Sequence, residues 1–197
     1  SLKHPGEQWI NNQLINTNLL NWWLSHQKQA KLISMGTSCC YEENGSLEEE
    51  DYLKGVPTSS LFAYAMCKRM LYIGQQNLAK QFGLKYLTLV PSTLYGPGYS
   101  IKNKIPHFIF DIIKKILIAK KENNSVELWG DGTQKRELMH IEDFLNNLLF
   151  LENIRENELI NIGAGKEFEI KHFAEIVCEI ADFDFKKIYF NKDKYII

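Results

Sequence analysis

A tyrosine and a lysine four residues apart, Tyr64 and Lys68, form the pair whose types and spacing best suit chemistry. This spacing places both side chains on one face of a helix. A neighbouring ammonium favours the phenolate, so we expect the pKa of Tyr64 to fall and its phenol to exchange a proton near neutral pH. Taken alone, the pair is more typical of a half-buried helix tyrosine beside a solvated lysine.

A hydroxyl residue upstream strengthens the case for chemistry. Thr37 closes the apolar run 31–35, which predicts a buried strand. A hydroxyl at the carboxyl end of a strand faces the crevice in which open α/β sheets bind ligands. An alcohol, a phenol and an ammonium together could polarise a carbonyl or alcohol during hydride transfer.

Helices and strands are expected to alternate along the chain, which favours an α/β fold with a mostly parallel sheet. Gly83 is expected to end the helix that carries the tyrosine and lysine. The acidic segment 42–51 is expected to be a solvated loop. The predicted helices span 7–26, 60–82, 106–119, 140–151 and 170–181, and the predicted strands span 31–35, 85–90, 126–129, 159–162 and 188–190.

Composition excludes several classes of protein. The 197 residues suffice for one core, or for one domain and part of another. The net charge of −1 gives no basic excess for nucleic acid, and no apolar run indicates a membrane span or a signal peptide. A reduced, cytoplasmic protein without a bound metal is expected, because neither zinc-site spacing nor a disulfide framework is present among the four cysteines, Cys39, Cys40, Cys67 and Cys178.

Several motifs occur in an order that resembles the extended short-chain dehydrogenase/reductase family, the nucleotide-sugar epimerases and dehydratases. The resemblance covers nearly the whole chain and implies a Rossmann-like, doubly wound parallel sheet with a smaller C-terminal substrate-binding domain. Residues 1–104 would be the C-terminal portion of the NAD(P)-binding domain, residues 105–197 mainly the substrate-binding domain, and residues 140–162 would return to the Rossmann domain. The motifs are 36–41, 64–68, 91–98, 129–132, 136–140 and 160–165.

The glycine-rich turn that opens a Rossmann domain is not found. Gly163-Ala164-Gly165 lacks the third glycine and is interpreted as a turn. We therefore expect a fragment or one piece of a split coding sequence, inactive by itself. The choice between NAD and NADP stays open, because the deciding residue would lie upstream. A non-catalytic remnant or scaffold is the alternative from another class.

The residues that follow Thr37 distinguish branches of the family. Dehydratases usually carry Asp-Glu there, whereas this chain has Ser38-Cys39, similar to the GDP-L-fucose synthases. That resemblance implies that Cys39 is the base and His107 the acid that invert C3 and C5 beside a C4 ketone. An equally simple interpretation makes the cysteine a small buried hydrophobe and the histidine a helix cap. An alternative alignment would put Asn103 at the histidine position.

The resemblance also assigns roles around the sugar. Tyr64 would protonate the C4 oxygen, Thr37 would hydrogen-bond that oxygen, and Lys68 would hold the nicotinamide ribose. Core packing is an equally good explanation of Trp129. The implied cofactor-binding residues are Met35, Gly36, Thr37, Ser38, Tyr64, Lys68, Pro91, Ser92, Thr93, Leu94 and His107, and the implied substrate-binding residues are Phe108, Lys115, Trp129 and Arg136.

Two departures from the family pattern leave the sugar open. Lys115 stands where the family typically has arginine, and Thr93 stands where it often has asparagine. The expected function is an NAD(P)-dependent epimerase/reductase for a 4-keto-6-deoxy sugar nucleotide, serving polysaccharide precursors. A 4-epimerase of the same family is the alternative.

A homodimer is expected from the family, through the helix that carries Tyr64 and the helix 7–26. Burial of Trp22 and Trp23 within the monomer is an equally good account of those two side chains.

Overall fold

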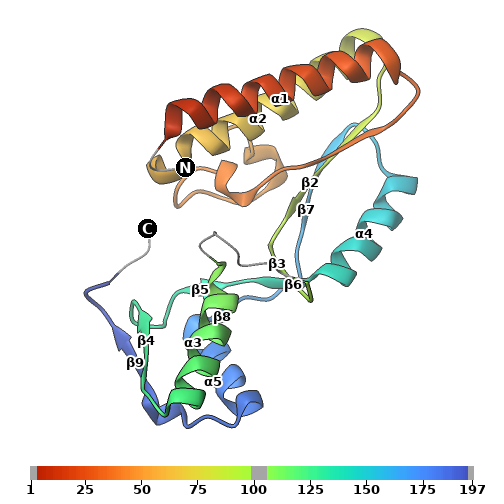
Figure 1. Ribbon diagram of the computed structural model, residues 1–197. Helices are drawn as coiled ribbons and strands as arrows, with labels where there is room; N and C mark the ends of the chain where they lie inside the picture. The colour runs from red at the N-terminus through yellow and green to blue at the C-terminus, as the bar shows by residue number, and fades with distance from the viewer. Residues whose placement is uncertain (1–3, 99–105, 195–197) are drawn as a thin grey trace. The chain divides into compact units, whose positions relative to one another are not determined.

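The computed structural model describes residues 4–98 and 106–194 (Figure 1). The chain forms two compact units. The first runs up to Leu94 and takes in Ile141–Gly163, and the second comprises Tyr95–His140 and the residues from Ala164 onward. Each unit is described by itself.

The first unit is built on a three-stranded parallel sheet in the order β1-β2-β7. Its strands are β1 (Leu32–Met35), β2 (Tyr86–Pro91) and β7 (Glu158–Ile162). The central strand β2 is buried along most of its length, as expected for a parallel strand covered on both faces. The predicted α/β fold with a parallel sheet is confirmed.

Two long helices of this unit, α1 (Pro5–His26) and α2 (Phe62–Phe82), lie side by side (Figure 1). A Cβ on Gly74 of α2 would lie 2.3 Å from Leu20 Cδ1 of α1, so the two helices approach closely there. Trp23 is 1% exposed and its Nε1 donates to Ala30 O at 2.9 Å, whereas Trp22 is 50% exposed. Burial within the monomer therefore accounts for Trp23 but not for Trp22.

Helix α2 is fixed to the sheet by a buried polar network. Ser34 Oγ of β1 and Thr88 Oγ1 of β2 both donate to Gln75 Oε1 of α2, at 2.9 and 3.1 Å. Buried polar groups must find such partners, so this network fixes the position of α2 along the sheet.

Helix α2 ends at Gly83, whose φ of 69° is the left-handed conformation that suits glycine. The predicted end of this helix is confirmed. Its start, predicted at about residue 60, lies at Phe62, directly after a 3-10 turn (Ser59–Leu61). The remaining helix of the first unit is α4 (Ile141–Ile154).

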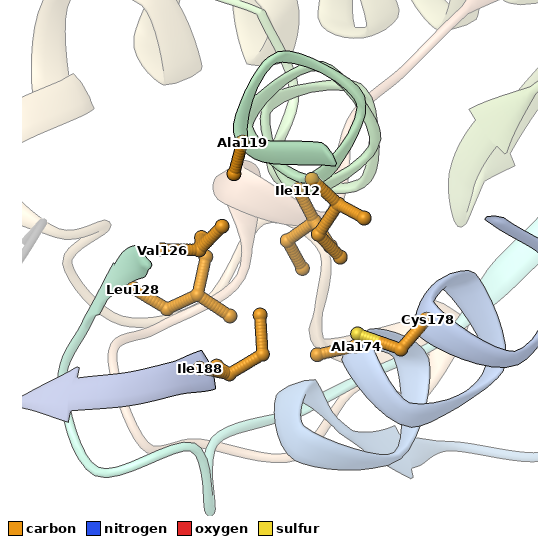
Figure 2. Packing of buried hydrophobic residues seen from close by; sticks show 8 residues of the cluster. Ile112, Ala119, Val126, Leu128, Ala174, Cys178 and Ile188 are labelled. Atoms are coloured by element: carbon orange, nitrogen blue, oxygen red, sulfur yellow. The ribbon is translucent and has the colours of Figure 1, made fainter. Parts of the chain in front are cut away.

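The second unit contains helices α3 (Phe108–Glu122) and α5 (Ile170–Ala181). Strands β4 (Val126–Trp129) and β9 (Ile188–Asn191) pair in parallel, and β5 (Lys135–Arg136) and β8 (Phe168–Glu169) pair antiparallel. The short strand β6 (Leu138–His140) also belongs to the second unit, whereas β3 (Thr93–Tyr95) lies where the chain passes from the first unit to the second. Figure 2 shows the core of this unit, formed by side chains that include Ile112, Ala119, Val126, Leu128, Ala174, Cys178 and Ile188.

Within the described ranges, no helix is long and apolar enough to cross a membrane.

Replacing Ile116 with alanine should destabilise the protein by about 2–5 kcal/mol, because the side chain is 0% exposed in the core of the second unit and its removal leaves a cavity. Ile180→Ala is the control, since Ile180 is 81% exposed and should cost less than about 0.5 kcal/mol. Urea denaturation followed by circular dichroism measures both. Equal losses for the two variants would contradict the assigned core.

Candidate active site

The alcohol of Thr37 and the phenol of Tyr64 lie in contact. Thr37 follows β1, has extended backbone angles and caps the 3-10 turn Ser38–Cys40, and its Oγ1 accepts from Cys39 N at 3.3 Å. Tyr64 lies in the first turn of α2, and the Thr37 side chain lies beside its phenol and lowers the pKa of that group. Two residues that are 27 positions apart in the sequence (64 − 37) thus come together.

The amine of Lys68 lies beside the same ring. Its Nζ is 6.0 Å from the centroid of the Tyr64 ring and donates to Met35 O at 2.8 Å. Met35 is the last residue of β1. One helix therefore brings both a phenol and an amine to the carboxyl end of this strand.

The expected fall in the pKa of Tyr64 is wrong for this structure. Burial raises the pKa of the phenol, and the hydrogen bond from Thr37 lowers it only in part. Burial also lowers the pKa of Lys68, whose amine donates to a main-chain carbonyl. The loss of hydration therefore destabilises the half-buried phenolate more than its neighbouring groups stabilise it.

The two adjacent cysteines lie in different surroundings. Cys40 is fully buried, its Sγ donates to Ala65 O at 3.3 Å, and burial raises the pKa of its thiol to about 11. Cys39 is only half-buried and lies in the turn that Thr37 caps. The description of a small buried hydrophobe thus fits Cys40, whereas Cys39 is only partly buried.

Gly36 is required by close packing at the end of β1. A Cβ there would lie 2.8 Å from Val90 Cγ2 and 2.9 Å from Tyr52 Oη. The Gly36 N–H donates to Leu89 O at 2.7 Å, which continues the pairing of β1 with β2. Any side chain would push Thr37 away from the strand, so this glycine fixes where the hydroxyl lies.

Polar groups also lie at the end of β2. Ser92 N donates to Ile162 O at 2.8 Å, which holds the segment 91–94 against β7. The Ser92 hydroxyl is buried and has no hydrogen-bond partner within residues 4–98 and 106–194. A buried hydroxyl in this state can accept or donate to a ligand.

In the second unit, Lys115 and Trp129 lie together. Lys115 Nζ is 5.7 Å from the Trp129 ring centroid and 2.7 Å from Asp111 Oδ2. Trp129 is 45% exposed at the end of β4, so core packing does not explain it. Arg136 is exposed on β5, where its Nη1 donates to Lys135 O at 2.8 Å.

The remaining predicted residues of this unit lie at the start of α3. His107 is the exposed residue that precedes the helix, and its carbonyl accepts from Phe110 N at 3.0 Å. The Phe108 ring packs against Phe173, with centroids 5.6 Å apart. The pairing of Cys39 with His107 stays a prediction, and Asn103 lies outside the described residues.

A family model described as the NAD dependent epimerase/dehydratase family matches residues 1–163. The chain belongs to this family. Among relatives, it is 33% identical over 159 residues to a GDP-L-fucose synthase of Sinorhizobium fredii, covering 78% of this chain and 50% of that protein. It is 28% identical over 190 residues to the GDP-L-colitose synthase of Yersinia pseudotuberculosis, covering 91% and 60%. The chain thus spans only about half the length of these family members.

Solved structures of similar enzymes share the fold of this chain. A GDP-mannoheptose C4 reductase from Campylobacter jejuni with NADP bound matches with a TM-score of 0.83 and 26% identity, over 97% of this chain and 65% of that one. The UDP-glucose 4-epimerase of Thermotoga maritima matches with a TM-score of 0.80 and 22% identity, over 97% and 59%. The predicted Rossmann-like fold and the predicted family are both confirmed.

Sequence reasoning missed Arg69. This residue is 5% exposed, although it directly follows Lys68. A usable signal existed, because Arg69 lies at helical spacing from Ala65 and Tyr72, both of which pack against the sheet core. A charge on the apolar face of a helix indicates a buried partner.

Replacing Thr37 with valine should raise the pKa of Tyr64 further, because the hydrogen bond that favours the phenolate is lost while burial persists. NMR titration of tyrosines labelled at Cζ measures this pKa, with Tyr64→Phe identifying the resonance. Ser38→Ala is the control, since Ser38 is exposed in the turn that directly follows Thr37. An unchanged or lower pKa in Thr37→Val would show that the two side chains do not share a hydrogen bond.

Proposed function

We propose that the full-length protein containing this chain is an NAD(P)-dependent epimerase/reductase that acts on a 4-keto-6-deoxy sugar nucleotide, in the manner of a GDP-L-fucose synthase. The observation that carries this proposal is the cluster of Thr37, Tyr64 and Lys68 at the end of β1. The likeness to GDP-L-fucose synthases supports the substrate class. A cytoplasmic homodimer is part of the proposal.

The residues at the strand ends fit a nicotinamide nucleotide. The buried Ser92 hydroxyl needs a partner, and the Lys68 amine is half-buried beside the phenol, where a ribose hydroxyl could accept from it. When bound, this group would supply the hydride for reduction at C4. The residues that would hold it are Met35, Gly36, Thr37, Ser38, Tyr64, Lys68, Pro91, Ser92, Thr93 and Leu94, with His107 from the second unit.

Proton transfer at C4 falls to Tyr64. Its phenol is kept protonated by burial, so it can donate to the sugar oxygen as negative charge develops there. Thr37 lies beside the phenol and would turn its single hydroxyl proton to the same sugar oxygen once substrate is bound. Lys68 stabilises the phenolate that remains after the transfer.

Inversion at C3 and C5 needs a base and an acid, because a C4 ketone acidifies the protons on both carbons. The half-buried thiol of Cys39, which lies two residues after Thr37, is the proposed base. His107 is the proposed acid, since an imidazole exchanges protons near neutral pH. The first unit would then be the nucleotide-binding portion and the second the substrate-binding domain.

The nucleotide end of the substrate is assigned to the second unit. Trp129 offers an exposed indole face beside a lysine cation, which suits a base or a sugar. Arg136 can contact phosphate oxygens with its planar guanidinium. Lys115 would add a point charge, and Phe108 would line the sugar side.

The test is an assay of the full-length protein with GDP-4-keto-6-deoxymannose and NADPH. We expect NADPH consumption, and Tyr64→Phe should lower kcat by about 100-fold or more because the proton donor is lost. Tyr41→Phe is the control, since the Tyr41 hydroxyl donates to Asn161 Oδ1 at 2.7 Å and has no role in the proposed reaction. No NADPH consumption by the wild type would eliminate the reductase and leave the 4-epimerase.

Replacing Cys39 with serine should abolish inversion while C4 reduction persists, because an alcohol is a far weaker base than a thiolate. In D2O, deuterium incorporation at C3 and C5 of the product should fall at least about 100-fold. Cys67→Ser serves as the matched control, because that thiol is buried on α2 and lies at 3.8 Å from Trp9 O. Unchanged deuterium incorporation in Cys39→Ser would exclude this thiol as the base.

A further inference from the structure

The guanidinium of Arg69 is buried and donates only to main-chain carbonyls among its described partners. Nε donates to Cys40 O at 2.9 Å, and Nη1 donates to Gly55 O at 2.9 Å. Nη2 donates to both Cys40 O and Lys54 O. The planar fork of arginine allows one side chain to satisfy three carbonyls in this way.

These carbonyls lie at the two ends of one loop. Cys40 ends the 3-10 turn that Thr37 begins, whereas Lys54 and Gly55 lie where the chain returns towards α2. The loop is also closed by its backbone, since Glu43 N donates to Val56 O at 3.3 Å. Arg69 therefore ties the start of the loop to its end.

Three residues of α2 contact the segment 35–40 at successive points. Lys68 donates to Met35 O, the Tyr64 phenol contacts the side chain of Thr37, and Arg69 donates to Cys40 O. The segment carries the hydroxyl and the Cys39 thiol between these points. Its conformation relative to the phenol is thus set from one helix.

We propose that Arg69 is a positioning residue for the reaction: by holding Cys40 O, it fixes the 3-10 turn so that Thr37 and Cys39 face the substrate beside Tyr64. This inference rests on the proposed function. The guanidinium touches no reacting atom and acts through the turn. Misplacement of a catalytic group by about 1 Å can cost roughly 100-fold in rate, so the effect should appear in kcat.

The variants are Arg69→Met, which keeps the length of the side chain but removes the donors, and Arg69→Lys, which keeps the charge but removes the fork. Leu71→Ala is the control, because it creates a cavity at a buried position of the same helix without touching the turn. If Arg69→Met does not fold, Arg69→Lys alone tests the proposal.

Kinetics of the full-length protein form the first arm. We expect kcat to fall about 10- to 100-fold in both Arg69 variants, with KM for the nucleotide sugar within about threefold of the wild type. Leu71→Ala should keep kcat within about threefold at a comparable loss of thermal stability. Equal losses of kcat in Leu71→Ala and the Arg69 variants would overturn the proposal, as would an unchanged kcat in Arg69→Met.

Hydrogen exchange forms the second arm and needs no substrate. The amides of Cys40 and Tyr41 donate to Thr37 O and Ser38 O, both at 3.1 Å, so their exchange reports opening of the turn. Both amides should exchange at least about tenfold faster in the Arg69 variants, while Leu89 in the central strand stays within about twofold. Uniform acceleration, or none, would overturn the proposal. A wild type inactive on every sugar nucleotide would refute the proposed function alone, and exchange would still decide whether Arg69 holds the turn.

Discussion

The contact of the Thr37 hydroxyl with the Tyr64 phenol is the interaction on which the account of this protein depends. It joins a residue after one strand to a residue in the first turn of a helix. Several features hold these two backbone segments in position relative to each other. Gly36 allows Val90 and Tyr52 to pack closely against the backbone next to Thr37. The Ser34–Gln75–Thr88 network fixes the position of the helix along the sheet. The chemistry is therefore a consequence of helix-to-sheet packing.

Burial gives this contact its chemical character. Burial favours the protonated phenol because a phenolate would lose hydration at this position, and burial also lowers the pKa of Lys68. A group that is protonated at rest is suited to donate to an oxygen on which charge develops. The site is thus a proton donor awaiting a substrate, rather than a phenolate formed in advance.

Local pattern was sufficient to predict much of this fold. Apolar runs located the parallel strands, Gly83 marked the end of α2, and the spacing of Tyr64 and Lys68 placed them on one helix face. The pKa direction could not be predicted, because desolvation depends on elements that pack from elsewhere in the chain. The burial of Arg69 could not be predicted for the same reason, because its hydrogen-bond partners lie 14 to 29 residues away in the sequence. The position of Lys115 beside the Trp129 ring likewise arises only once α3 packs against β4.

The most direct test is a crystal structure of the full-length protein with NADP and a nucleotide-sugar substrate analogue. The account predicts that the C4 oxygen of the sugar lies within about 3.2 Å of both the Tyr64 phenol and the Thr37 hydroxyl, with the Cys39 sulfur facing C3 or C5. A sugar bound with C4 turned away from the phenol, or with the thiol pointing into the protein, would contradict it.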